Sequence, residues 1–483
     1  LILSSFMLLS NRPIMISVMR STQRLFLLSL ITAFFDFGIC RAEEDSLPPS
    51  QPEVVLRSGL KIPLVGFGIG NLPHESIPQV VDDQLRAGAR LIDTAYASNN
   101  EQILADAISK FDASGEGGGG TDEELEPLHV VTKVWYTHLG YKRTRLSIQE
   151  SLNNLQVTSN RPIHVHMLLH WPRCDDEIPW MNCEEEENNL PQLVKDIGPP
   201  PHLDKADAFL ESWRAMEDVY LDHSQKFTRL GKLRRGQSDV RQPFVSSIGV
   251  SNFGLEDMKK LVDGGSHVPP QIYQGNSWLV FHDPFLMDFL EEHRIFFQAF
   301  NVMNGIVQKT NDAPAANQVL TDLSRELAAE AYYKDKEYTP MISEATVVLA
   351  YFIRSNFGVI PRAASPSHQQ ENSSKAVSAI LPHLTDYHIK QLETAIPALM
   401  KGEDAHTSVS FMNALETSIQ IHWVHPKTNE EFLVSNIINP GSVEKQKSHQ
   451  GHIFVAYDPD RTVRKEFVVD SPYGEDQFFM VEL

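Results

Sequence analysis

Three side chains that can carry or bind a proton each end a short apolar run of the sequence. Asp93 ends the second such run (RLIDTA), Lys133 the third (VVTKVW) and His170 the fourth (MLLHWP). An acid, an amine and an imidazole at neighbouring strand ends would form a plausible proton-transfer site. Each alone could be a structural residue, so their shared position is what favours chemistry.

The elements that would carry these side chains alternate regularly between residues 56 and 404. The runs that we expect to be buried strands are Leu64–Gly68, Ala89–Asp93, His129–Trp135, Ile163–His170, Val245–Val250, Ile272–Asn276, Phe296–Phe300 and Gly358–Pro361. Amphipathic stretches between them predict an α/β fold, a closed parallel (β/α)8 (TIM) barrel rather than an open sheet. Polar insertions at 112–126, 173–204, 224–242 and 309–338 are interpreted as solvated loops. Catalytic side chains of such a barrel lie at the carboxyl ends of its strands.

The sequence resembles the aldo-keto reductases, whose members have this barrel and move a hydride between NAD(P)H and an aldehyde or ketone. The matching residues are Lys61-Ile62-Pro63, Gly66, Gly68, Asp93-Thr94-Ala95, Asn100-Glu101, Lys133, His170-Trp171-Pro172, Trp213–Glu217, Gly249–Phe253, Gln274, Ile360-Pro361-Arg362 and Glu371-Asn372. The resemblance implies an NAD(P)H-dependent oxidoreductase domain at 51–404 that reduces a small carbonyl substrate to an alcohol.

The family's catalytic set is Asp, Tyr, Lys and His, and the resemblance maps three of these onto Asp93, Lys133 and His170. The tyrosine is the general acid, but a comparison without gaps puts Ser98 at its position. Tyr96 lies two residues earlier and would share the side of Ser98 in an extended loop, whereas in a helix it would point away. We therefore take Tyr96 as the candidate acid. The alternative is a catalytically weakened scaffold.

The same resemblance implies a cofactor site and two walls of a substrate pocket. Ser251, Asn252 and Gln274 match the residues that hold the nicotinamide carboxamide, and Phe300 replaces a stacking tyrosine. The remaining implied contacts are Arg362 and His368 at the 2′-phosphate, Glu371 and Asn372 at the adenine, and Trp135 and Trp171 in the substrate pocket. The set favours NADP(H) over NAD(H), although a single firm cation weakens the preference because a phosphate needs several donors.

Asn372 also begins the glycosylation sequon Asn372-Ser373-Ser374. A glycan at this position would collide with the adenine edge of the cofactor site. We expect the sequon to be unused, or the chain not to enter the glycosylating lumen.

In residues 405–483 the sequence pattern changes from strand–helix alternation to short β-rich segments separated by turns. This pattern predicts a small all-β sandwich. They resemble the β domain of the von Hippel–Lindau protein through Val409, Phe411, Asn413, Trp423, Pro440-Gly441, Ser448, Gly451-His452 and Phe454. The resemblance implies that this domain binds a protein or peptide partner. Trp423, Ser448 and His452 would recognise a hydroxyproline of that partner. Phe454 replaces a tryptophan of that site and Ser435 a tyrosine. The alternative is a sandwich whose Trp and His serve only core and surface.

Composition sets the limits. The 483 residues include 42 Lys and Arg against 63 Asp and Glu, a net charge of −21. This balance argues against a nucleic-acid partner, which selects clustered basic residues. Three cysteines are too few for a disulfide scaffold or a thiolate zinc finger, and we predict no metal site. No apolar run after residue 42 is long enough to span a membrane.

The first 42 residues have the pattern of a signal peptide. Arg20 and Arg24 precede the apolar run Leu25–Phe35, and the small residue Ala42 precedes two acidic residues. We expect the secretory pathway (endoplasmic reticulum lumen or secretion), with a bipartite organelle leader as the alternative. Because residue 1 is Leu, the stretch before Met19 can be a gene-model extension. In an oxidising lumen Cys174 and Cys183 could close a small loop, or they could be two inert thiols.

Overall fold

The computed structural model describes residues 51–115, 125–198, 207–232, 243–303, 306, 309–334, 341–405, 407–425, 428–448, 451–471 and 473–482. The predicted signal peptide lies outside these residues, as do parts of the insertions at 112–126, 173–204, 224–242 and 309–338. No helix of the described ranges combines the length and the apolar character that a membrane span requires.

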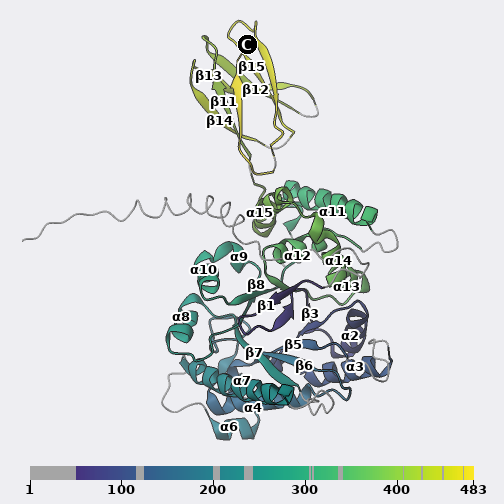
Figure 1. Ribbon diagram of the computed structural model, residues 1–483. Helices are drawn as coiled ribbons and strands as arrows, with labels where there is room; N and C mark the ends of the chain where they lie inside the picture. The colour runs from purple at the N-terminus through teal and green to yellow at the C-terminus, as the bar shows by residue number, and fades with distance from the viewer. Residues whose placement is uncertain are drawn as a thin grey trace, which may run out of the picture. The chain divides into compact units, whose positions relative to one another are not determined.

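Eight parallel strands form a ring at the centre of the larger part of the chain (Figure 1). Their order follows the sequence: β3 (Phe67–Gly68), β4 (Leu91–Asp93), β5 (Leu128–Val134), β6 (Ile163–Leu169), β7 (Phe244–Ser251), β8 (Ile272–Asn276), β9 (Phe296–Phe300) and β10 (Gly358–Ile360). The ring closes where Val65 bridges Val359 and the Gly66 amide donates to the Val359 carbonyl at 2.9 Å. The predicted barrel is therefore confirmed, and each predicted run overlaps one of its strands.

Apolar side chains on both faces explain why these runs form strands. Every residue of β10 is buried, and five of the seven residues of β6 are buried in succession. A strand covered on both sides needs such a run, since one face packs inside the barrel and the other against helices. Gly249 permits the closest approach, because a Cβ there would lie 2.2 Å from the Ile272 carbonyl oxygen of β8.

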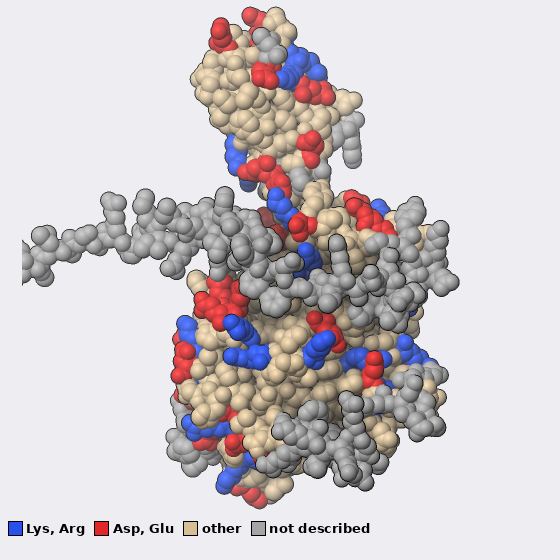
Figure 2. Space-filling model, viewed as in Figure 1, with Lys and Arg blue, Asp and Glu red and all other residues tan. Residues whose placement is uncertain are grey.

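Helices surround the ring (Figure 1). They are α2 (Ile77–Arg86), α3 (Glu101–Ala113), α4 (Tyr141–Asn154), α5 (Cys183–Asn188), α6 (Gln192–Ile197), α7 (Ala208–Lys232), α8 (Leu255–Asp263), α9 (Leu279–His282), α10 (Pro284–Glu292), α11 (Pro314–Lys334), α12 (Glu344–Arg354), α13 (Pro366–Glu371), α14 (Ser374–Ile380) and α15 (Asp386–Lys401). The insertions predicted as loops contribute α5, α6 and α11. An antiparallel hairpin, β1 (Glu53–Val55) with β2 (Lys61–Pro63), precedes the ring. Figure 2 shows basic side chains lying singly or in small groups beside acidic ones on the face in view.

The C-terminal residues form two sheets. Strands β14 (Val443–Ser448), β11 (Thr407–Asn413) and β17 (Gln477–Val481) make one, and β13 (Glu431–Ile438), β12 (Ile419–Val424), β15 (Ile453–Tyr457) and β16 (Arg464–Val468) the other. They enclose their own cluster of buried side chains, including Phe411, Ile421 and Phe454. The buried Asn413 amide donates to the Thr417 and Ile438 carbonyls, both at 2.8 Å, and so fixes the turn between β11 and β12. The two sheets confirm the predicted β class.

Three histidines stack near the beginnings of β5 and β6. The ring of His129 lies 5.1 Å from that of His164 and 5.2 Å from that of His166, with a nitrogen contact of 3.0 Å between His129 and His166. Serine hydroxyls of β7 meet the other nitrogens, Ser247 at 2.7 Å from His166 and Ser246 at 2.8 Å from His164. Burial lowers the pKa of His129 to about 3 and of His164 to about 4, and it lowers the pKa of His166 well below the ordinary value. The cluster is therefore neutral in the folded protein.

Acid is expected to unfold the barrel through this cluster. A histidine whose pKa is lowered by folding stabilises the fold above its unfolded pKa of about 6.5, and that contribution falls as the pH drops. Between pH 6.5 and 5 the loss amounts to about 2 kcal/mol for each neutral histidine. Urea unfolding across this range should show a shallower pH dependence in His164→Gln. The exposed His267→Gln serves as control, and equal slopes in both variants would contradict the assignment.

Candidate active site

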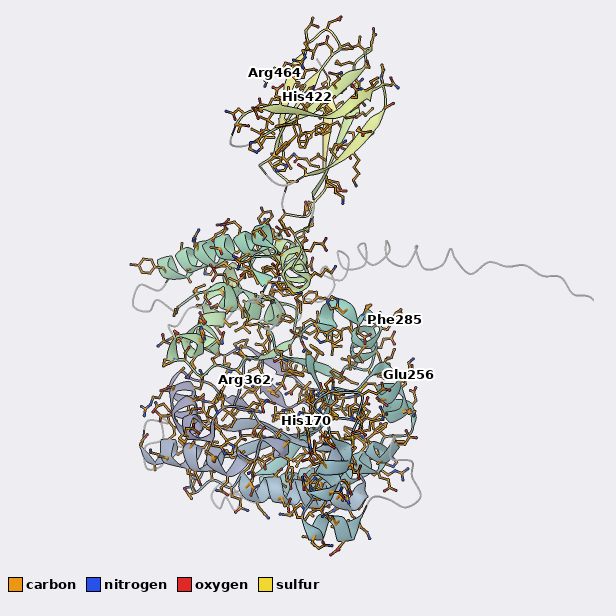
Figure 3. The ribbon with its side chains drawn as sticks, turned by 180° about the vertical axis from the view of Figure 1, so that it is seen from behind. His170, Glu256, Phe285, Arg362, His422 and Arg464 are labelled. Carbon is orange, nitrogen blue, oxygen red and sulfur yellow. A yellow bond between two sulfur atoms is a disulfide. The ribbon has the colours of Figure 1, made fainter. Side chains whose placement is uncertain are left out.

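A cleft of about 1210 Å³ opens at the carboxyl ends of the barrel strands. Its walls bring together most of the residues selected from the sequence: Asp93, Lys133, Trp135, His170, Trp171, Ser251, Asn252, Gln274, Phe300, Arg362 and Asn372. Figure 3 labels two of them, His170 and Arg362, over the barrel. Tyr96, His368 and Glu371 are not among its lining residues.

The centre of the cleft is a buried ion pair between neighbouring strands. Lys133, which is 4% exposed, donates from Nζ to Asp93 Oδ1 at 2.6 Å and to the Thr94 carbonyl at 2.7 Å. Gln274 Nε2 donates to the same Asp93 oxygen at 2.8 Å and to Gln298 Oε1 at 3.0 Å. A buried charge is tolerated only when it is paired and hydrogen-bonded, and here both partners are satisfied. The ammonium can therefore act on developing negative charge in the cleft.

His170 stands beside this pair as a neutral imidazole. Burial and the positive charge of Lys133 lower its pKa well below the ordinary value. Its backbone carbonyl accepts from Asn252 Nδ2 at 3.1 Å, and its ring meets the edge of Trp135 at 4.9 Å. Nδ1 has no hydrogen-bond partner within the described residues. A neutral imidazole carries one N–H, so His170 can donate to a carbonyl oxygen without delivering a full charge.

The structure places Tyr96 outside the cleft. Tyr96–Ser98 forms a short 3₁₀ turn (η2), and residues two apart in such a turn point in different directions. The Tyr96 hydroxyl donates to Glu150 Oε2 at 3.0 Å on α4, outside the cleft. Burial and the Glu150 charge raise the pKa of Tyr96, whereas a general acid at neutral pH needs a lowered one.

Ser98 instead lines the cleft where the sequence comparison put the family's tyrosine. A Cβ on Gly70 would lie 3.5 Å from Ser98 Oγ, so these two small residues are neighbours. Ser98 is much smaller than the tyrosine that the resemblance implies at its position, and Gly70 has no side chain, so the cleft is open on this side.

The residues implied for the nicotinamide lie side by side at the ends of β7, β8 and β9. Asn252 adopts a positive φ of 59° and its Nδ2 donates to Ser251 Oγ at 3.1 Å. The Gln274 amide nitrogen is held by Asp93 and Gln298, which leaves its oxygen as an acceptor. Phe300 ends β9 and presents an aromatic ring to the cleft. Amide, hydroxyl and ring are groups that can hold a nicotinamide carboxamide and its ring face.

The implied adenosine end fits the cofactor less completely. Arg362 lines the cleft and donates from Nη1 to the Gly70 carbonyl at 3.0 Å. Asn372 Oδ1 is buried without a partner among the described residues, an acceptor that an adenine amino group would satisfy. His368 is 66% exposed and lies 3.8 Å from Glu371 rather than in the cleft. Of the cations that line the described cleft, Lys133 is committed to Asp93, so Arg362 is left for phosphate.

The sequon at Asn372 is built into the fold. Ser373 caps α14 by accepting from the Ala376 amide at 3.2 Å, and Ser374 is 7% exposed. That the sequon is unused, or that the chain does not enter the glycosylating lumen, stays a prediction.

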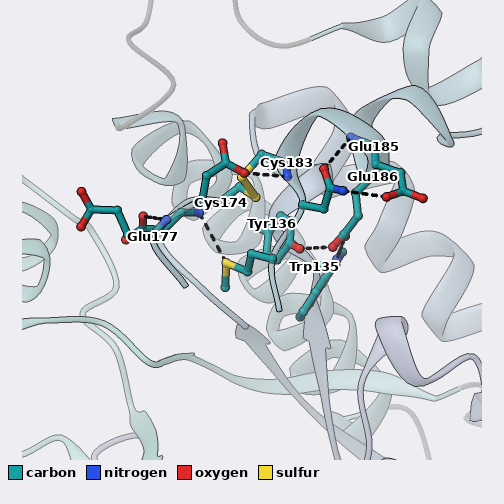
Figure 4. Close-up of a disulfide and its surroundings, with 11 residues drawn as sticks. Trp135, Tyr136, Cys174, Glu177, Cys183, Glu185 and Glu186 are labelled. Carbon is teal, nitrogen blue, oxygen red and sulfur yellow. Dashed lines mark hydrogen bonds between the residues drawn. A yellow bond between two sulfur atoms is a disulfide. The ribbon is translucent and has the colours of Figure 1, made fainter. Parts of the chain in front are cut away.

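Sequence reasoning missed two residues that line the cleft, Trp180 and Glu186. Cys174 and Cys183 form a disulfide (Figure 4). Trp180 belongs to the loop that this disulfide closes. The ring centre of Trp180 lies 6.2 Å from that of Trp135 and 5.6 Å from that of Trp171. One turn after Cys183, Glu186 accepts hydrogen bonds from Trp135 Nε1 at 2.7 Å and from the Tyr136 hydroxyl. The acidic run around Glu186 was interpreted as a solvated loop, and only the paired cysteines signalled a fixed structure.

Comparison with known proteins agrees with this geometry. The aldo/keto reductase family model matches residues 64–396. The chain belongs to this family. The match stops short of the C-terminal β sheets, which have no family assignment.

Individual relatives are distant but extend over most of the barrel. A glycerol 2-dehydrogenase (NADP(+)) of Hypocrea jecorina is 25% identical over 373 residues, 75% of this chain and 95% of that protein. An NADH-dependent D-xylose reductase of Candida parapsilosis is 23% identical over 333 residues, 68% and 89% of the two chains. A solved Bombyx mori aldo-keto reductase in complex with NADP has 22% identity, covers 73% of this chain and 93% of its own, and has a TM-score of 0.48.

Removing the disulfide is expected to loosen the mouth of the cleft. A Cys174→Ser/Cys183→Ser variant loses a cross-link over a short loop, which corresponds to about 2–3 kcal/mol of stability if the loop unfolds with the barrel. Chymotrypsin should then cut at the exposed Trp180 faster than in the wild type. Dithiothreitol should have the same effect on the wild type and none on the variant. Unchanged cleavage would show that other contacts hold the loop.

Proposed function

We propose that this protein is an NAD(P)H-dependent reductase that converts a small aldehyde or ketone to an alcohol. The observation that carries the proposal is the buried Lys133–Asp93 pair with a neutral His170 beside it, at one end of the barrel. NAD(P)H supplies the hydride when bound. His170 donates a hydrogen bond that orients the carbonyl oxygen, and the Lys133 ammonium stabilises the negative charge that develops on it.

This site has no strong acid positioned to donate the proton that the reduction needs. The Ser98 hydroxyl is a far poorer acid than a phenol with a pKa of about 10. The space beside Ser98 and Gly70 can admit water, which would deliver the proton at lower efficiency. Losing a positioned general acid lowers the rate by about 10²–10⁴-fold. The second candidate, a reductase-like scaffold without turnover, rests on this same deficiency.

Two substitutions at the η2 turn distinguish the candidates. Ser98→Tyr should raise kcat/KM for aromatic aldehydes by about 10²-fold or more, because it restores a phenol beside Lys133. Tyr96→Phe should leave turnover unchanged, since its hydroxyl is bound to Glu150, and the exposed Tyr387→Phe is the matched control. Turnover is followed by oxidation of NADPH or NADH. Loss of activity in Tyr96→Phe would return the acid to Tyr96, and no turnover in any variant would favour the scaffold.

We further propose NADP(H) as the cofactor, with a small preference over NAD(H). One exposed cation, Arg362, faces the part of the cleft where the phosphates would lie, and a phosphate prefers several donors. The similar proteins differ in the cofactor that their names give: one is an NADH-dependent D-xylose reductase and another a glycerol 2-dehydrogenase (NADP(+)). Fluorescence titration of the protein with NADPH and NADH measures the preference. An NADPH affinity a hundredfold or more higher would require phosphate donors beyond Arg362.

The proposed organisation is a reductase domain at 51–404 followed by a β domain at 405–483, in the secretory pathway. The separate cluster of buried residues in the β sheets supports the boundary. The disulfide between Cys174 and Cys183 supports an oxidising compartment, because cytosolic thiols are kept reduced. Imaging a chain with a C-terminal tag in cells tests the compartment. N-terminal sequencing of the mature product tests cleavage after Ala42.

We also propose that the β domain binds peptides that carry hydroxyproline. Three implied residues come together at one place: the Trp423 ring lies 5.4 Å from that of His452, and Ser448 Oγ lies 3.2 Å from His452 Nδ1. Trp423 Nε1 is buried without a partner among the described residues. Phe454 does not join them, since it is 2% exposed and packs on Phe411 in the core. An indole wall with a hydroxyl and an imidazole can hold a proline ring and its hydroxyl.

The β domain is expected to prefer hydroxyproline to proline. A site built for a hydroxyl leaves its own polar groups unpaired when the hydroxyl is missing, so matched peptides should differ by about 1–3 kcal/mol. Calorimetry on the full chain measures both forms. His452→Ala should abolish the difference, and the distant His267→Ala should not. Equal affinity for the two forms in the wild type would make this a generic β module.

A further inference from the structure

A second groove, about 800 Å³ in volume, lies next to the catalytic cleft. Residues of the η2 turn, of α3, of the η3 turn (Tyr136–His138) and of α4 and α5 line it, and Ala97, Trp135 and Glu186 line both hollows. The groove contains Tyr96, the residue that the sequence suggested for catalysis. Nothing in the proposed carbonyl chemistry uses it.

The groove carries negative charge. Glu101, Glu150 and Glu186 line it, and none of its described lining residues is Lys or Arg. Glu101 is 3% exposed and accepts from Thr132 Oγ1 at 2.6 Å, and burial raises its pKa, so Glu150 and Glu186 supply most of the charge. The nearby Arg143 is paired with Glu187 through two contacts of 2.8 and 3.0 Å, so its positive charge is largely compensated. A cation is the ligand that this field favours.

An unpartnered imidazole nitrogen lies in the same wall. His138 lines the groove, is 2% exposed, and meets Thr137 Oγ1 through Nδ1 at 3.0 Å. Its Nε2 has no hydrogen-bond partner within the described residues. Burial and the charge of Arg143 lower the pKa of His138 to about 4, so the ring is neutral at neutral pH. With its proton on Nδ1 the ring donates to Thr137, and Nε2 is left needing a donor.

Aromatic surface completes the lining. The half-buried Tyr96 ring lies 4.7 Å from the His138 ring, and its hydroxyl is already bound to Glu150. Trp135 forms the wall shared with the cleft. Aromatic rings accept both methylene chains and cations at their faces.

We propose that this groove is a binding site for a protonated aliphatic di- or polyamine. Its ammonium groups donate to the carboxylates and to His138 Nε2, and its methylene chain packs along Tyr96 and Trp135. Binding does not require turnover, so this site stands or falls independently of the proposed reductase activity.

The test compares 1,4-diaminobutane with butane-1,4-diol, which has the same length and no charge, by calorimetry on the full chain. The diamine should bind at least about tenfold more tightly, and added salt should weaken only the diamine. Glu150→Gln keeps an acceptor for the Tyr96 hydroxyl while removing the charge, and should weaken diamine binding about five- to tenfold. Glu184→Gln, the same change on the exposed side of α5, should have little effect.

Two results would overturn the proposal. Equal binding of diamine and diol in the wild type would show that the groove does not recognise charge. Equal weakening in Glu150→Gln and Glu184→Gln would show that the diamine responds only to the overall acidity of the protein. The comparison of diamine and diol uses the wild-type protein alone, so it remains valid even if Glu150→Gln folds poorly.

Discussion

The buried pair of Lys133 and Asp93 is the constraint on which the barrel's functional end depends. An ammonium that is 4% exposed is tolerated only when it is paired and hydrogen-bonded, and the acceptors described for it come from β4 and the residue after it. Gln274 on β8 reaches across the ring to the same carboxylate. Strands far apart in the sequence must therefore close in one register before the charge is satisfied. The ring has to be complete for the site to exist.

The same pair explains why two losses on one side of the cleft are tolerated by the fold. Ser98 and Gly70 lie next to each other, and neither is needed to satisfy Lys133, Asp93 or Gln274. Small residues there reduce contacts with a ligand without leaving a buried charge unpaired. The hydrogen bonds of the ion pair are therefore made whether or not an acid stands beside it.

Elements set by local patterns could be predicted from the sequence, and loops set by distant contacts could not. The strands follow from short, doubly buried apolar runs, and Asp93, Lys133 and His170 follow from their place at strand ends. The direction of the Tyr96 side chain could not be predicted, because it depends on a 3₁₀ turn and on Glu150, 54 residues away in the sequence. Glu186 looked like one of several solvated carboxylates, and only the folded loop brings it to Trp135 and Tyr136. Phe454 matched a ligand-contacting position, yet strand alternation turns it into the core.

Trp135 links the two hollows of the barrel's functional end. Its ring meets His170 on one side, its indole nitrogen is held by Glu186 on α5, and the disulfide fixes the start of that helix. A side chain with its N–H bonded and its faces packed has little rotational freedom, so the wall between cleft and groove is rigid while the disulfide and Glu186 are in place. Because the acidic groove and the catalytic cleft use this wall together, an occupant of one contacts a residue that shapes the other. Tyr96 lines the neighbouring groove, and the same 3₁₀ turn presents Ser98 to the cleft.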